Sequence, residues 1–226
     1  MARKVVGNLR KFILIFRQLF WRYKVKNIPD GVYASRLPLK NVFEEYAFEN
    51  FGAPSKEQHK IWTKQTCGIA SLKVITDAVE KSKDKTIYLM AQESREYNCF
   101  IVPGIVNEPR DIKGIFHEGL LKYAKSFGFQ GFRESLAPFE KVVWYLYKNW
   151  LFLASVNIYG IWGDPDEGSD KMHIVLVVGF KKEKGKITEV YYKDSATRLK
   201  WRRDTDVVDY EIFRTNFNKR GIFIKA

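Results

Sequence analysis

The sequence predicts one α+β domain in which helices come first and antiparallel strands follow. Apolar residues recur at helical spacing in the earlier part of the chain, and the period changes to two after about residue 150. The 226 residues are 46% hydrophobic and 15% aromatic, with only 7 prolines, so most of the chain can bury a core. Helices followed by antiparallel strands are typical of the α+β class.

Three segments carry the helical pattern. Apolar residues recur every three or four positions after Cys67, which predicts a helix from there to about Glu80. Residues 114–128 form a second amphipathic pattern, closed by a glycine that suits a C-terminal cap. Residues 138–148 predict a third helix, with a proline in its first turn. Residues 27–60 contain turn signals but little periodicity.

The strands come after these helices. Residues 151–157 predict a strand, and residues 158–170 predict a loop rich in glycine and aspartate. Residues 173–180 form a wholly apolar run after a histidine, which is typical of a buried strand. The turn sequence KKEKGK then leads into a strand over residues 187–193, and residues 222–225 predict a short last strand.

The N-terminal segment is basic and apolar by turns, so we divide the chain into an amphipathic helix, residues 1–26, and a main domain, residues 27–226. Its longest apolar run has five residues, too few for a membrane span or a secretory signal. We expect the helix to dock on the domain, with two alternatives: peripheral membrane contact through residues 3–24, or a degenerate export signal. We therefore expect a cytoplasmic protein, with membrane association as the alternative. One helical face would hold Leu9, Phe12, Ile13, Phe16, Leu19 and Phe20.

The charge and the cysteines restrict the partners. The net charge is +13, which suits nucleic acid, an anionic membrane or an acidic partner. However, the sequence has no zinc-finger spacing and no RNA-binding signature, so we expect no nucleic-acid partner. The two cysteines and three histidines do not stand at ligand spacing, so we expect no metal site and no cofactor.

Cys67 has the context of a nucleophile. A helix N-terminus favours a thiolate through its unpaired N–H groups and the helix dipole, and we expect Gly68 to leave room for a substrate beside the sulfur. The alternative is a buried structural cysteine, as we expect for Cys99.

Among the three histidines, His173 has the best context for a general base. His59 lies in a polar segment, and His117 lies in the second predicted helix. His173 opens a buried strand, and Asp194 ends the next strand along the chain. Neighbouring antiparallel strands would bring this carboxylate close enough to orient the ring. The alternative role for Asp194 is a turn residue or a cap.

The segments TCGIASLKVI, HIVLVVGF and YYKDSA together resemble the cysteine peptidases that remove double-glycine leaders from bacteriocins. The resemblance spans roughly residues 58–200. Because we find no transmembrane segment and no Walker A motif, the chain is similar to the stand-alone, transporter-free relatives. The resemblance implies a papain-like fold, in which a helix carrying Cys67 packs on an antiparallel sheet carrying His173 and Asp194. It also implies that these residues are nucleophile, base and orienting group.

The resemblance leaves the second oxyanion donor open. Family members carry a glutamine several residues before the cysteine. In this chain Gln65 stands two residues before Cys67 and Gln58 stands nine before it, so either or neither serves.

The predicted function is a cysteine peptidase that cleaves a peptide or protein substrate through a thioester acyl-enzyme. Two alternatives remain. One is an acyltransferase of the transglutaminase type on the same triad. The other is a papain-like module that binds peptides without catalysis.

Overall fold

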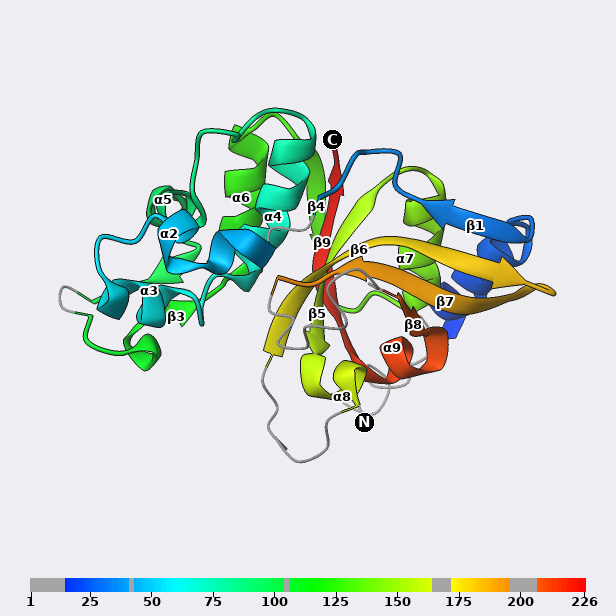
Figure 1. Cartoon of the computed structure of the whole chain (residues 1–226). Coiled ribbons are helices and arrows are strands. Elements are labelled where there is room, and N and C mark those ends of the chain that lie inside the picture. The colour runs from blue at the N-terminus through cyan, green and yellow to red at the C-terminus, as the bar shows by residue number, and fades with distance from the viewer. Residues whose placement is uncertain (1–14, 41–42, 104–105, 164–171, 196–206) are drawn as a thin grey trace, which may run out of the picture.

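The computed structural model of the chain describes residues 15–40, 43–103, 106–163, 172–195 and 207–226. Helices from the first half of the chain form a group beside a twisted sheet, as the left and right parts of Figure 1 show. Every strand pair in the described residues is antiparallel. The predicted α+β class, with helices first and antiparallel strands after them, is confirmed.

The first group holds five short helices around a two-stranded ribbon. The 3-10 helices η1 (Phe43–Tyr46), η2 (Ser94–Tyr97) and η3 (Pro109–Asp111) connect them. The helices are α2 (Phe48–Phe51), α3 (Lys56–Trp62), α4 (Cys67–Ala78), α5 (Ile87–Glu93) and α6 (His117–Ser126), and the ribbon pairs β2 (Phe100–Ile101) with β3 (Lys113–Gly114).

The sheet has seven strands, six of them in the order β4-β9-β5-β6-β7-β8, and β1 pairs with the far end of β6. Three helices, α7 (Phe139–Tyr147), α8 (Ile158–Trp162) and α9 (Tyr210–Asn216), pack against it. The strands are β1 (Gly31–Ala34), β4 (Gln130–Glu134), β5 (Leu151–Asn157), β6 (Met172–Glu183), β7 (Lys186–Lys193), β8 (Val207–Asp209) and β9 (Phe217–Lys225).

Both faces of the central strands are buried, which explains their continuous apolar runs. Leu153 and Leu176 face the core that α4 and α6 cover. Their neighbours Phe152 and Val177 face the opposite core, under α7 and α9. Successive side chains of a strand point to opposite faces, so each strand supplies both cores. Alternation between apolar and polar residues is therefore absent from β5 and most of β6.

The predicted helices and strands are present, but several begin or end at other residues than predicted. The helix that begins at Cys67 ends at Ala78, because Glu80 adopts a left-handed backbone with φ 62°. The other two predicted helices are α6 and α7, and β5 has the predicted bounds of residues 151–157. The strand predicted over residues 173–180 runs on to Glu183, through the first half of the expected turn, and the last strand begins at Phe217.

The sequence prediction missed several short elements. The loop expected over residues 158–170 begins with α8, and α5 lies in a stretch for which no element was predicted. Residues 27–60 contain β1 and α3. Strand β1 is possible only because β6 carries Gly179 where the strands meet: a Cβ there would lie 2.2 Å from the carbonyl oxygen of Tyr33. These elements depend on tertiary contacts rather than on local periodicity.

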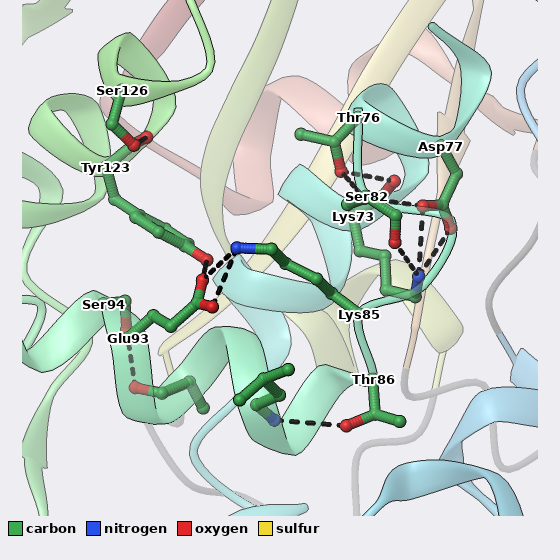
Figure 2. A network of polar contacts seen from close by, with 12 residues as sticks. Lys73, Thr76, Asp77, Ser82, Lys85, Thr86, Glu93, Ser94, Tyr123 and Ser126 are labelled. Atoms are coloured by element: carbon green, nitrogen blue, oxygen red, sulfur yellow. Dashed lines mark hydrogen bonds and ion pairs between the residues drawn. The ribbon is translucent and has the colours of Figure 1, made fainter. Parts of the chain in front are cut away.

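Ion pairs, one of them made by a buried lysine, link elements of the helical group, and Figure 2 shows part of this network. Lys73 on α4 is 3% exposed, and its Nζ lies 2.8 Å from Asp77 Oδ2 and 3.4 Å from Glu45 Oε2. Next to it, Lys85 Nζ lies 2.7 Å from Glu93, a residue of α5. Buried charges are tolerated when they are paired in this way. The network fixes the middle of the helix that begins with Cys67.

Residues 15–26 are helical and lie against the sheet side of the molecule. Arg17 pairs with Glu134 at 3.4 Å, and Val25 is buried. The helix docks on the domain, but Phe16 and the neighbouring apolar residues Leu19 and Phe20 are exposed. Leu9, Phe12 and Ile13, the rest of the expected apolar face, lie outside the described residues. The division into residues 1–26 and 27–226 stays a prediction.

Candidate active site

Cys67 is the first residue of α4, where backbone N–H groups have no acceptor within the helix. Thr66 precedes it as the N-cap, and its side chain makes no capping hydrogen bond. The thiol is half-buried. The positive end of a helix dipole favours the thiolate, so α4 places Cys67 where its anion is stabilised.

Gly68 serves packing rather than substrate access. A Cβ at this position would lie 2.8 Å from Cδ1 of Ile115 and 3.1 Å from Cδ1 of Ile174, and the glycine is buried. The expectation that Gly68 leaves room for a substrate is therefore wrong. The glycine instead lets α4 approach the strand that carries the histidine.

The sheet brings His173 and Asp194 together from adjacent strands. His173 lies at the start of β6, and Asp194 directly follows β7. The Nε2 atom of His173 lies 2.8 Å from Oδ1 of Asp194, with 11% and 1% of the two side chains exposed. With Nε2 occupied, Nδ1 is the ring nitrogen left to form the hydrogen bond with Cys67.

Trp162 is a part of the site that the sequence did not reveal. It is the last residue of α8, and its Nε1–H donates to Oδ2 of Asp194 at 3.1 Å. The second carboxylate oxygen therefore also has a partner in the protein. The only signal for this residue was a tryptophan in a segment that we expected to be a loop.

Cys67 and His173 shift each other's pKa toward an ion pair. Burial raises the pKa of the Cys67 thiol, but the charge of His173, a hydrogen bond to it and backbone hydrogen bonds from Ile174 and Gly68 lower it below its usual value. Burial likewise lowers the pKa of His173, but Asp194 and Cys67 raise it well above its usual value. A thiolate beside an imidazolium is the expected state near neutral pH.

Cys99 and His59 have structural surroundings. Cys99 is fully buried, and burial raises the pKa of its thiol to about 12. His59 Nε2 lies 2.7 Å from the carbonyl oxygen of Tyr46, and its ring packs edge-on against Phe51. Among the described residues, no group of three or more His, Cys, Asp or Glu side chains is arranged to hold a metal ion.

The structure separates the two candidate glutamines. Gln65 lines the cleft next to Cys67, and its Nε2 donates to the carbonyl oxygen of Pro109 at 2.9 Å. Gln58 lies on α3, and its Oε1 accepts a hydrogen bond from Trp62 Nε1 at 3.2 Å. Gln58 is not among the described residues that line the cleft. Gln65 is the glutamine within reach of a bound substrate.

Two cavities of different chemistry meet at Cys67. The first, of about 540 Å³, is the aromatic cavity. The second, of about 600 Å³, is the cationic cavity, where His117 bonds Ser155 through Nε2 at 2.8 Å. Burial, followed by the charges of Arg220 and Arg133, lowers the pKa of His117, which indicates a positive field there. The aromatic cavity is lined by Tyr46, Ile158, Tyr159 and Trp162, and the cationic cavity by Lys64, Lys113, Arg133 and Arg220.

Comparisons with known proteins agree with this geometry. A family model described as the Peptidase C39-like family matches residues 49–221. A solved structure, that of a candidate C39-like peptidase from Bacillus anthracis, superposes with a TM-score of 0.53 at 14% identity. The match covers 87% of this chain and 98% of that one, and at this identity it shows the fold. No curated protein matches the chain.

Alkylation by iodoacetamide tests the lowered pKa of Cys67. We expect Cys67 to react readily at pH 7 and to slow as the pH falls through its lowered pKa, because only the thiolate attacks. His173→Ala removes the positive charge, so at pH 7 the rate should fall about tenfold or more. Mass spectrometry of the two cysteine peptides measures both rates.

Cys99 is the internal control in this experiment, since its buried thiol should stay unlabelled over the same pH range. Equal rates for the wild type and the His173 variant across that range would contradict an activated pair.

Proposed function

The chain belongs to the Peptidase C39-like family, and on this premise we propose that it is a cysteine peptidase that uses Cys67, His173 and Asp194. One observation carries the proposal. The His173 ring is hydrogen bonded through Nε2 to the Asp194 carboxylate, and the same ring interacts with Cys67, so that the pKa of the thiol is lowered and that of the histidine is raised. This is the arrangement that nucleophilic catalysis by a thiol needs.

In the proposed first step, the Cys67 thiolate attacks the carbonyl carbon of the scissile peptide. The carbonyl oxygen takes up the negative charge and needs hydrogen-bond donors. The backbone N–H of Cys67 at the start of α4 is the first donor. The amide of Gln65 is the second, since its Nε2 carries two hydrogens and Pro109 accepts only one of them.

In the second step, the C–N bond breaks and the His173 imidazolium gives its Nδ1 proton to the leaving amine. The product is a thioester on Cys67 and a neutral imidazole. Asp194 keeps the ring in position through Nε2, and Trp162 keeps Asp194 in position. Neutral His173 then takes a proton from water, which attacks the thioester and regenerates the free thiolate.

The cavities support a proposal about substrate class. The cationic cavity holds four Lys and Arg side chains, and its one lining carboxylate, Glu134, is already paired with Lys141 and Arg17. A peptide bound across Cys67 would therefore place an acidic side chain in the cationic cavity. It would place an apolar or aromatic side chain in the aromatic cavity.

Replacing the nucleophile tests the peptidase directly. Cys67→Ala should reduce peptide hydrolysis to background, because the other thiol, Cys99, is fully buried and cannot attack a substrate. Cys99→Ala is the matched control: it removes the other thiol, which is fully buried and lines neither cavity, and should retain activity. Cleavage of an unstructured protein substrate, followed by mass spectrometry, measures both. Hydrolysis by Cys67→Ala at the wild-type rate would contradict the proposal.

Asp194→Asn should shift the alkaline limit of activity to lower pH. The charge of Asp194 raises the pKa of His173, so without it the imidazolium loses its proton at lower pH and can no longer protonate the leaving amine. Trp162→Phe keeps that charge and should lower the rate without moving the limit. The pH profile of kcat/KM separates the two variants, and an unmoved limit in Asp194→Asn would exclude this role.

Charge reversal tests the cationic cavity. Wild-type enzyme should prefer peptides with Glu over peptides with Lys at the side-chain position that the cavity accepts. The double variant Arg133→Glu/Arg220→Glu should change the ratio of kcat/KM values about tenfold or more toward Lys. Each reversed charge is expected to change the interaction free energy with the substrate by roughly 1 kcal/mol. The control Lys186→Glu changes one charge at the far end of the β6–β7 hairpin and should leave the ratio unchanged.

A further inference from the structure

The helix of residues 15–26 is fixed to the domain by its C-terminal end. The buried side chain of Lys182, on β6, reaches this end, and its Nζ donates to the carbonyl oxygens of Val25 and Lys26, each at 3.1 Å, and to that of Ile28. A cation at this position satisfies carbonyls that have no partner within a helix and complements the helix dipole. The orientation of the helix on the domain is therefore defined.

The outward face of this helix is apolar. Five large side chains, spaced as one stripe along the helix, are between 45% and 65% exposed. They are Ile15, Phe16, Leu19, Phe20 and Tyr23. Single exposed apolar residues are common, but a continuous stripe of five on one helix indicates an interaction surface.

Basic residues border the stripe on both sides. Successive helical residues are about 100° apart, so Arg22 falls on one flank and Arg17 and Lys24 on the other, while Lys26 lies at the C-terminal end of the stripe. The first 29 residues of the sequence contain 8 Lys and Arg and no Asp or Glu. Arg17 and Arg22 are paired with Glu134 and Glu140, and the sequence of this segment contains no acidic residue to balance the other six.

We propose that this apolar face lies in the headgroup region of an anionic lipid bilayer and holds the protein on the membrane surface. An apolar stripe flanked by Lys and Arg, with aromatic residues in the stripe, is the pattern of an interfacial helix. The described helix would be about 18 Å long, well short of the ~30 Å hydrocarbon core. Among the described residues, no helix is long and apolar enough to cross a membrane.

None of the five residues of the apolar stripe lines the cleft, although Arg17 on its flank pairs with Glu134 of the cationic cavity. Val25 and Ile28 belong to the core under α7, whereas α4 covers the opposite face of the sheet. A membrane bound at residues 15–26 would leave Cys67 open to substrate. The proposal therefore does not depend on the peptidase activity and can be tested without it.

Vesicle co-sedimentation of the full chain tests this proposal. We expect binding to vesicles of phosphatidylcholine mixed with phosphatidylglycerol, little binding to phosphatidylcholine alone, and weaker binding at high salt. Phe16→Ser/Leu19→Ser should lower binding about tenfold or more, because two large side chains no longer enter the lipid. Lys26→Glu, which keeps the apolar face, should also weaken binding.

The matched control is Leu89→Ser/Ile212→Ser, which removes two exposed apolar side chains from helices α5 and α9 and should bind as the wild type does. Circular dichroism and the alkylation rate of Cys67 check that each variant is folded. Absent binding to the anionic vesicles, or unchanged binding of both test variants, would overturn the proposal. So would a dimer in light scattering that only Phe16→Ser/Leu19→Ser dissociates, without vesicle binding, since a second copy would then occupy the face.

Discussion

A buried carboxylate, Asp194, is the constraint on which the site depends. An ionised carboxylate loses several kcal/mol of hydration on burial unless it is paired and hydrogen bonded. Asp194 is 1% exposed, and its two oxygens accept hydrogen bonds from His173 on β6 and Trp162 on α8. Three elements must therefore meet at one point for the carboxylate to be stable. The charge of Asp194 also raises the pKa of His173. The same buried carboxylate therefore fixes the position of these elements and favours the imidazolium.

The contact between α4 and β6 carries this constraint into the helical group. Ser71 Oγ donates to the carbonyl oxygen of Ile174 at 3.3 Å, one turn beyond the thiol. Because Gly68 has no side chain, the helix approaches the strand closely enough for the Ile174 backbone to hydrogen bond the sulfur of Cys67. Further along α4, the ion pair of Lys73 with Glu45 at 3.4 Å links the middle of the helix to η1. The position of the thiol is thus set by packing on both sides rather than by a flexible loop.

The sequence predicts the parts of this site that periodicity controls. The two predicted strands and the turn between them place His173 beside Asp194, and the predicted helix places Cys67 at its first residue. Trp162 was missed because α8 has only five residues, includes a glycine and ends in a left-handed glycine, so its local pattern resembles a loop. The choice between Gln58 and Gln65 depends on the direction of α3 relative to α4, and spacing along the chain does not contain that direction. The outward orientation of the N-terminal helix likewise depends on Lys182, a residue more than 150 positions away.

Some of the cations behind the net charge of +13 are already paired within the protein and are not available to a partner. Lys73 and Lys182 are buried, and each is surrounded by carboxylate or carbonyl oxygens, so neither can attract a ligand. Lys141 is paired with Glu134 beneath the helix of residues 15–26. Two groups of the remaining cations lie beside the surfaces described above: one at the rim of the cationic cavity, the other along the basic N-terminal segment. An acidic peptide in the cleft matches the first group, and an anionic bilayer at the helix matches the second.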